Sequence, residues 1–121
     1  MAQEAAKRMK SGSVIINVSD VGAHKMWSSY SAYVTIKSAV ETLTRLLAKT
    51  YFPGISVNTI APGLVLPSEN VTDEGWQNLV DRLPLKRPVS LGEITTALEF
   101  ILINDAIIGQ VIVVDGGYSL I

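Results

Sequence analysis

A tyrosine and a lysine four positions apart, Tyr33 and Lys37, are the residues of this sequence best suited to acid–base chemistry. They begin a segment whose apolar residues recur at helical spacing, and in a helix a gap of four places two side chains on one face, one turn apart. A free tyrosine has a pKa of about 10 and exchanges protons poorly near neutral pH, but a neighbouring ammonium favours the phenolate and lowers that pKa. The spacing therefore predicts an acid–base pair. An aromatic residue at a helix start, followed by a solvated lysine, would give the same pattern.

Composition excludes several other kinds of site. The 121 residues include no cysteine and one histidine, which excludes thiol catalysis, disulfides and a histidine-rich metal site, so no metal is predicted. The formal net charge of −1 offers no basic surface for nucleic acid and no polybasic membrane anchor. No apolar run approaches the roughly 18 residues of a spanning helix, and no export signal opens the sequence. We therefore expect a cytoplasmic protein without nucleic-acid or membrane partners.

The hydrophobic pattern predicts one α/β domain over residues 1–121. Four segments carry strong helix formers or helical spacing: residues 2–10, 33–50, 73–83 and 90–102. Three short apolar runs are typical of strands buried on both faces of a parallel sheet: residues 14–18, 55–60 and 111–114. Ser90 and Glu93 form a capping box, and Ile94, Ile101 and Leu102 are predicted to point inward. The order αβαβααβ predicts about three parallel strands with flanking helices.

A strand as apolar as residues 14–18 is usually central, yet only one helix precedes it. The chain is therefore predicted to be the second half of a larger, doubly wound sheet that self-associates. An apolar stripe of the long helix is expected to face the sheet: Ile36, Val40, Leu43 and Leu47. That leaves Thr44, Leu46 and Ala48 for a partner, while Glu41 and Arg45 are expected to form a surface i,i+4 pair.

Five motifs in order and spacing resemble the short-chain dehydrogenase/reductase family: Gly12–Ser19, Tyr33-x-x-x-Lys37, Val57–Gly63, Gly109-Gln110 and Val114–Gly117. The resemblance implies the carboxy-terminal half of a Rossmann-type fold and hydride transfer with NADP or NAD, NADP being preferred. It implies that Tyr33 is the catalytic acid–base residue and that Lys37 holds the nicotinamide ribose. It also implies that Pro62, Gly63 and Val65 lie against the nicotinamide, and that the helices of residues 2–10 and 33–50 form a dimer contact.

One departure concerns the family's catalytic serine, whose place thirteen residues before Tyr33 is taken by Asp20. Ser19 is adjacent, but neighbouring residues at a strand end point to opposite faces. An aspartate here resembles the pteridine reductases, in which it would act with Tyr33 as a second acid or orient a pterin-like substrate. An ionised Asp20 would disfavour the Tyr33 phenolate and oppose Lys37. The alternative is that Asp20 caps a loop and the site is impaired.

The glycine-rich turn that binds a dinucleotide's pyrophosphate is absent from the sequence, and Pro67 replaces a threonine that often contacts it in the family. The sequence thus predicts a nicotinamide half-site only. We expect a truncated, pteridine reductase-like oxidoreductase for a small carbonyl or pterin-like substrate, present as a homo-oligomer. The alternative is an inactive, truncated member that serves as an oligomerisation or interaction module. His24 is expected to face solvent rather than substrate, and Trp27 and Met26 either line the pocket or cover the core.

Overall fold

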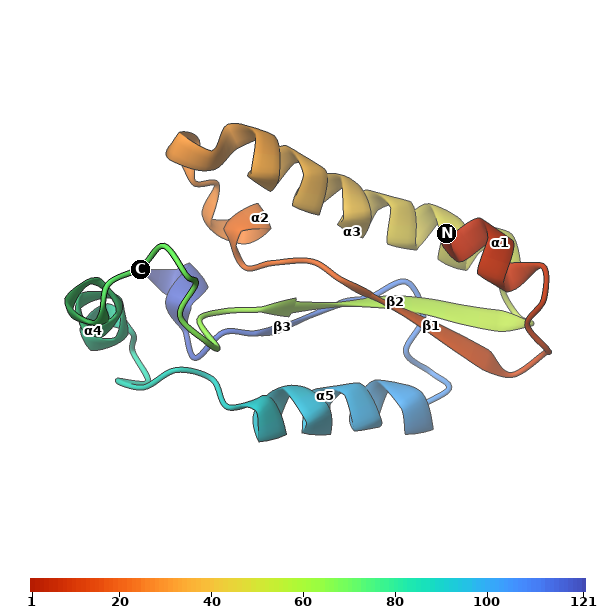
Figure 1. Ribbon diagram of the computed structural model, residues 1–121. Coiled ribbons are helices and arrows are strands. Elements are labelled where there is room, and N and C mark those ends of the chain that lie inside the picture. Colours follow the sequence, from red (N-terminus) through yellow and green to blue (C-terminus); the bar gives the residue numbers. More distant parts are fainter.

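One sheet of three parallel strands organises the chain, which the computed structural model describes over residues 1–121 (Figure 1). The strands are β1 (Ser13–Val18), β2 (Ile55–Pro62) and β3 (Val111–Val114), in the spatial order β1-β2-β3. Ser13 lies opposite Ile55, and Thr59 lies opposite Val111. Parallel neighbours need long crossovers, and helices provide them here. The predicted α/β class and the three parallel strands are confirmed.

Helices cover both faces of the sheet (Figure 1). The long helix α3 (Ser31–Tyr51) lies on one face with the short helices α1 (Ala2–Ala6) and α2 (Gly22–Lys25), and α5 (Leu91–Ile103) lies on the other. The remaining elements gather near the carboxyl ends of the strands: α4 (Asp73–Arg82) and the 3₁₀ turns η1 (Ser28–Tyr30) and η2 (Tyr118–Leu120). Loops and helix starts therefore meet at that end, where open α/β sheets place ligands.

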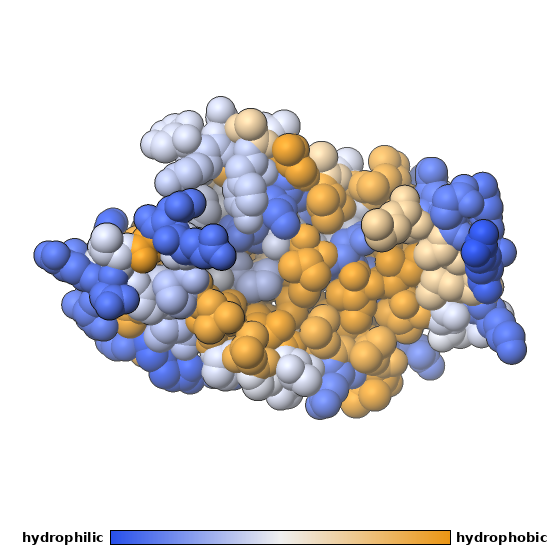
Figure 2. Space-filling view, viewed as in Figure 1, coloured by the Kyte–Doolittle hydropathy of each residue, from blue (hydrophilic) through white to orange (hydrophobic).

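Burial differs between the central strand and the edge strand. The side chains of Val57, Ile60 and Ala61 on β2 are 0–1% exposed. β1 has a neighbour on one side only, so its residues are half-buried and Val18 is 58% exposed. The prediction that β1 is buried on both faces is thus wrong. Figure 2 shows apolar side chains gathered across the middle of this side of the molecule, between α3 and α5.

The face of α3 that meets the sheet is partly polar, whereas the sequence predicted an apolar stripe there. Thr44 is fully buried, and hydrogen bonds satisfy its hydroxyl there. The hydroxyl accepts from Asn17 Nδ2 at 2.9 Å and shares a hydrogen bond with Thr59 Oγ1 at 2.6 Å. Ile36 and Leu43, which were predicted to face the sheet, are 63% and 46% exposed. Of the residues predicted to be left for a partner, Leu46 is exposed, but Thr44 and Ala48 are buried. The strands present polar side chains at this point, so the helix turns its own polar residues toward them.

The helix ends match the sequence predictions in part. The capping box is confirmed, with Glu93 N donating to Ser90 Oγ at 3.1 Å and Ser90 N donating to Glu93 Oε2 at 2.8 Å. In α5, Ile101 is buried as predicted, but Leu102 is half exposed. The first helix ends at Ala6 rather than at residue 10. None of the helices combines the length and the apolar character needed to cross a bilayer.

Candidate active site

Asp20 and Tyr33 meet at the carboxyl end of the sheet. Asp20 follows β1, Tyr33 lies in the first turn of α3, and the phenol donates to Asp20 Oδ2 at 2.9 Å. The other carboxylate oxygen accepts the Gly22 backbone N–H at 2.6 Å, which holds the side chain in a tight turn. A Cβ at Gly22 would lie 3.0 Å from Asp20 Oδ1 and 2.8 Å from the Trp27 ring, so only glycine leaves this turn undisturbed. Tyr33 is 41% exposed, which leaves the pair open to a ligand.

Lys37 lies one turn after Tyr33 on the same face of α3, as predicted. Its ammonium is 5.6 Å from the centroid of the Tyr33 ring and donates to the Val18 carbonyl at 3.3 Å. An ammonium has three N–H donors, and Val18 O is its one hydrogen-bond partner in the chain. Two donors therefore remain for a polar ligand beside Tyr33.

The electrostatics of Tyr33 differ from the sequence prediction. Burial, followed by the hydrogen bond to Asp20 and the negative charge of Asp20, raises the pKa of Tyr33 to about 12. The predicted lowering by Lys37 is therefore wrong for the free chain, because the carboxylate touches the phenol oxygen while the ammonium points to Val18. The phenol therefore stays protonated near neutral pH.

Pro62, Gly63 and Val65 lie at the end of β2, beside the turn that carries Asp20. The Pro62 carbonyl accepts from Val21 N at 2.9 Å, which ties the Asp20 turn to β2. A Cβ at Gly63 would lie 2.7 Å from Asp115 Cα, so close packing requires glycine there. The backbone N–H and C=O of Val65 have no hydrogen-bond partner within the chain. An amide of this kind can bind the complementary amide of a ligand.

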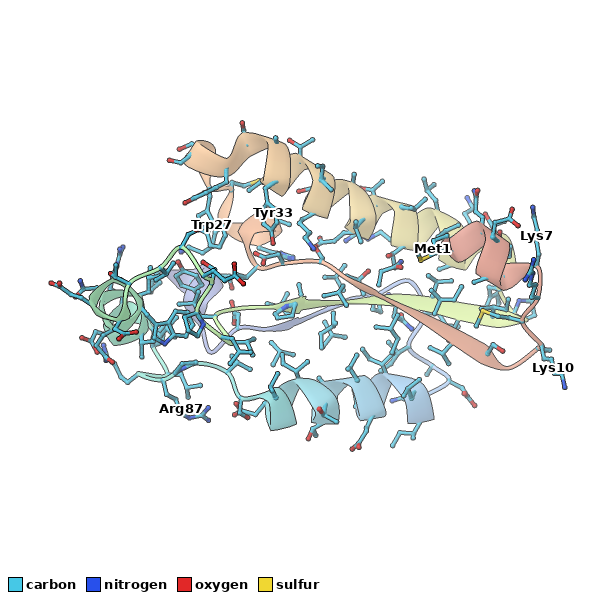
Figure 3. The ribbon with its side chains drawn as sticks, in the orientation of Figure 1. Met1, Lys7, Lys10, Trp27, Tyr33 and Arg87 are labelled. Carbon is cyan, nitrogen blue, oxygen red and sulfur yellow. The ribbon has the colours of Figure 1, made fainter.

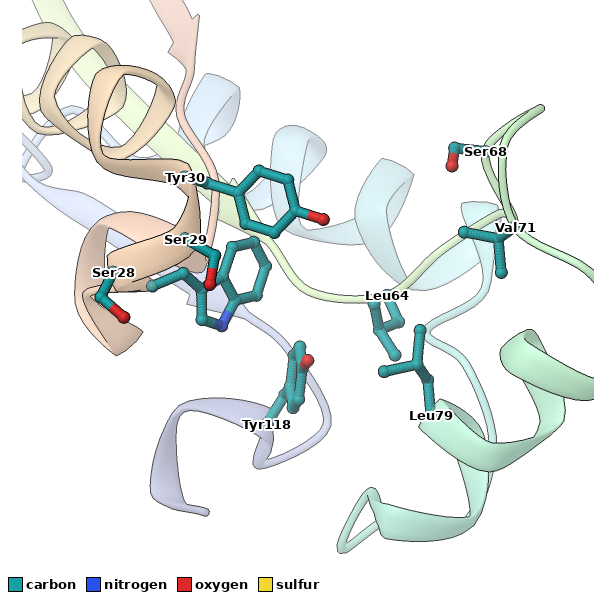
Figure 4. Close-up of a pocket in the computed structure, with 9 residues that line it drawn as sticks. Ser28, Ser29, Tyr30, Leu64, Ser68, Val71, Leu79 and Tyr118 are labelled. Atoms are coloured by element: carbon teal, nitrogen blue, oxygen red, sulfur yellow. The ribbon is translucent and has the colours of Figure 1, made fainter.

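An aromatic cavity of about 460 Å³ lies at the same end of the molecule, although neither Asp20 nor Tyr33 lines it (Figure 4). Nine residues line it: Trp27, Ser28, Ser29, Tyr30, Leu64, Ser68, Val71, Leu79 and Tyr118. The Trp27 ring centroid is 6.3 Å from that of Tyr30 and 6.0 Å from that of Tyr118. Because Trp27 also packs on Gly22, the cavity and the Asp20 turn share a wall, and Figure 3 shows Trp27 and Tyr33 at the same end of the molecule.

The cavity resolves one alternative from the sequence and adds residues that the sequence analysis missed. Trp27 lines the cavity, whereas Met26 is 66% exposed. Tyr30 and Tyr118 were not predicted as site residues, since they lie far apart in the sequence. Lys25 supports Tyr118, with its ammonium 4.5 Å from the ring centroid and donating to the Tyr118 carbonyl at 3.0 Å.

A polar cluster lies behind the site. Glu41 Oε1 accepts from Ser19 Oγ at 2.8 Å and from His24 Nε2 at 3.0 Å, and Glu41 is 8% exposed. The predicted surface pair of Glu41 with Arg45 is wrong. His24 is exposed and does not line the cavity, as predicted, and it also contacts Glu41. Ser19 points away from Tyr33, as expected from its place beside Asp20. No group of three or more histidine, cysteine or acidic residues is arranged to hold a metal ion.

Comparison with known proteins identifies the family. A family model described as enoyl-(acyl carrier protein) reductase matches residues 1–119. The chain belongs to the short-chain dehydrogenase/reductase family. It is 34% identical to 1-cyclohexenylcarbonyl-CoA reductase from Streptomyces collinus, over 99% of this chain and 46% of that protein. It is 29% identical to dihydromonapterin reductase from Citrobacter koseri, over 88% of this chain and 44% of that protein.

Solved structures agree with this assignment. FolM alternative dihydrofolate reductase 1 from Brucella suis, in complex with NADP, superposes with a TM-score of 0.91 at 35% identity, covering 99% of this chain and 49% of that one. A small-chain dehydrogenase in complex with NADPH gives a TM-score of 0.91 at 30% identity, over 98% of this chain and 57% of that one. The chain thus spans about half the length of the relatives it matches. The resemblance to pteridine reductase-like members of the family is confirmed.

Proposed function

We propose that this chain is the carboxy-terminal half of an NADP(H)-dependent oxidoreductase that reduces a pterin-like heterocycle, and that it supplies the proton donor and the nicotinamide half-site. The observation that carries the proposal is the 2.9 Å hydrogen bond from Tyr33 to Asp20 beside an aromatic cavity. A flat heterocycle suits a cavity walled by Trp27, Tyr30 and Tyr118, since aromatic rings favour stacked or edge-on neighbours. The similarity to dihydromonapterin reductase and to a dihydrofolate reductase points the same way.

Each residue of the pair has a distinct role in this proposal. Tyr33, kept neutral by its raised pKa, donates its proton to the reduced ring. Asp20 orients the substrate, because an N–H of the heterocycle can take the place of the Tyr33 hydroxyl at Oδ2, and when protonated Asp20 acts as a second acid. The Gly22 N–H holds Oδ1 throughout and so fixes the orientation of the carboxylate.

The residues present fit the nicotinamide half of the cofactor, which supplies a hydride when it is bound. The two unused N–H donors of Lys37 suit the hydroxyls of a ribose, and the open backbone amide of Val65 suits a carboxamide. Pro62 and Gly63 would form the floor beneath that ring. The sequence contains no glycine-rich pyrophosphate turn, so we expect the isolated chain to bind NADPH no more tightly than about millimolar, roughly 4 kcal/mol.

A second candidate function is that of a catalytically inactive oligomerisation or interaction module. The exposed stripe of α3, made by Ile36, Leu43 and Leu46, supports it, because three large apolar side chains on one helix favour contact with a partner. The same stripe supports a homo-oligomer under the first proposal. The two functions differ in the role of Tyr33, which is needed for catalysis but not for an interaction module.

A chimera tests the proposal. The chain would replace the matching half of the Brucella suis reductase, and NADPH oxidation would be followed with a dihydropterin and with a simple ketone. We expect turnover of the pterin and a loss of at least about 10²-fold in the Tyr33→Phe chimera. A chimera that folds and binds NADPH but turns over neither substrate would favour the interaction module. Micromolar NADPH binding by the isolated chain would contradict the half-site.

A further inference from the structure

Three segments converge on one buried carboxylate oxygen outside the proposed site. Glu41 on α3 accepts through Oε1 from Ser19, at the end of β1, and from His24, on α2. No fully buried side-chain nitrogen or oxygen in the chain lacks a hydrogen-bond partner. Burying a carboxylate is costly unless donors compensate for its lost hydration. None of these three residues lines the aromatic cavity, so the cluster is not a subsite for the substrate.

The cluster ties together the two segments that carry the acid–base pair. Tyr33, Lys37 and Glu41 follow one another at four-residue spacing, which places them along one face of α3. Ser19, which immediately precedes Asp20, shares its one hydroxyl proton between Glu41 Oε1 at 2.8 Å and the Lys37 carbonyl at 3.2 Å. The strand end bearing Asp20 is therefore bound to α3 at the two turns that follow Tyr33.

His24 adds a second restraint on the same turn. It belongs to α2, whose first residue, Gly22, donates its backbone N–H to Asp20 Oδ1. Glu41 therefore holds both sides of Asp20. It binds Ser19, the residue before Asp20, and it binds His24 in the helix that follows Asp20. Asp20 lies between these two anchors in the sequence.

We propose that Glu41 is a positioning residue, which holds Asp20 at hydrogen-bond distance from Tyr33 by bracing Ser19 and His24 against α3. The effect of Glu41 on catalysis rests on the proposed function, whereas the coupling of Glu41 to the contact between Asp20 and Tyr33 does not. Hydrogen bonds weaken steeply with distance and angle, so a displacement of about 1 Å at the Asp20 turn would break the contact. Glu41 acts through Asp20 and touches no part of the cavity.

The ionisation of Tyr33 in the 121-residue chain itself reports the coupling, without cofactor or substrate. Tyrosine Cζ carbon signals would be followed by NMR with ¹³C-labelled tyrosine, and Tyr33→Phe would identify the signal. With a pKa of about 12, roughly a tenth of Tyr33 is ionised at pH 11, against roughly nine tenths at the ordinary value of 10.0. Asp20→Asn gives the largest change in Tyr33 ionisation that loss of the Asp20 carboxylate can cause. Circular dichroism at the same pH confirms that each variant is folded.

Glu41→Leu removes the acceptor, and we expect Tyr33 to become more ionised at pH 11, in the direction set by Asp20→Asn. Glu41→Gln keeps an oxygen that can accept from both donors and should restore the wild-type fraction. Arg45→Gln, on the exposed neighbouring turn, is the matched control and should change nothing. Should Glu41→Leu fail to fold, Ser19→Ala gives the same reading, because it removes the direct link to Asp20.

A folded Glu41→Leu or Ser19→Ala variant with the wild-type Tyr33 ionisation would overturn the positioning role, whatever its melting temperature. So would an equal change in Arg45→Gln. These outcomes are independent of the chimera experiment, since an inactive chimera leaves the coupling between Glu41 and Tyr33 intact. If the coupling holds, Glu41→Leu in an active chimera should lower kcat and displace its pH profile, with the KM for NADPH unchanged.

Discussion

Replacing Asp20 by asparagine isolates the effect of its charge on Tyr33. The two side chains have nearly the same shape, and the asparagine oxygen can still accept the Gly22 N–H that now binds Oδ1 at 2.6 Å. What changes is the group facing the phenol, which loses its negative charge. Burial is the largest cause of the raised pKa of Tyr33 and stays in place, whereas the Asp20 contributions are lost.

The size of the change follows from the contact distance. Two unit charges 2.9 Å apart in a medium as polar as water interact by about 1.4 kcal/mol, which corresponds to about 1 in pKa. The interaction between two charges is weakest in a medium as polar as water. In Asp20→Asn the pKa of Tyr33 should therefore fall from about 12 to about 11 or below. Since the folded-state pKa lies above the ordinary 10.0, the associated stability is complete below pH 10.0 and is lost as the pH rises toward 12. In Asp20→Asn that loss should be smaller.

Titration of the Tyr33 signal between pH 9 and pH 12 measures this directly. At pH 11 the ionised fraction should rise from about a tenth to about one half or more. Tyr33→Phe provides the baseline for the other three tyrosines. A Tyr33 pKa that stays at about 12 in a folded Asp20→Asn variant would refute the view that the two residues form one unit.

Four further changes test other parts of the molecule. Thr44→Val should destabilise the fold by about 1–3 kcal/mol and lower Tm by roughly 4–12 °C, because it leaves the side chains of Asn17 and Thr59 without their partner. Thr44→Ser keeps the hydroxyl and should lower Tm less. Equal melting temperatures for the two variants would contradict this. Hydrogen bonds from the Arg87 guanidinium and then from Ser90 lower the pKa of Glu93 to about 2. The stability that they give the fold is present above pH 4.5 and is lost as the pH falls toward 2, so Glu93→Gln should reduce the acid dependence of the melt. Ile36→Lys with Leu43→Lys should weaken self-association in light scattering, and a wild-type monomer at tens of micromolar would oppose an oligomer. In the chimera, Asp20→Ser should favour simple ketones over pterins, and an unchanged preference would reduce Asp20 to a loop residue.

Periodicity and capping predicted the elements well, because they depend on local sequence. The three strands, the long helix carrying Tyr33 and Lys37, and the Ser90 cap all follow from spacing and residue type within a few turns of chain. The pairing of Asp20 with Tyr33 came instead from the resemblance to the family, because Asp20 takes the place of its catalytic serine. The sequence alone could not show that the phenol donates to the carboxylate rather than pairing with Lys37.

The errors on α3 share one physical cause, which is that apolar stripes do not identify a buried face when the sheet presents polar groups. Asn17 and Thr59 draw Thr44 inward, and Ser19 and His24 draw Glu41 inward. Each partner is at least fifteen residues away in sequence from the α3 residue it contacts. No pattern within α3 contains that information, and so Ile36 and Leu43 were assigned to the wrong side.

The charge at Asp20 determines which direction of proton transfer the free site favours. With a neutral hydroxyl in place of Asp20, two effects on the Tyr33 phenolate would remain. Burial would disfavour the phenolate, and the Lys37 ammonium would favour it. The carboxylate adds to the effect of burial on the Tyr33 pKa, so the proton stays on Tyr33. Such a site favours a ligand that can both accept a proton and offer an N–H to Oδ2, because that ligand satisfies both residues once their mutual hydrogen bond opens. A simple ketone accepts a proton but offers no donor, and it leaves the carboxylate with one partner fewer. This difference, rather than the size of the cavity, is the physical basis for expecting a nitrogen heterocycle.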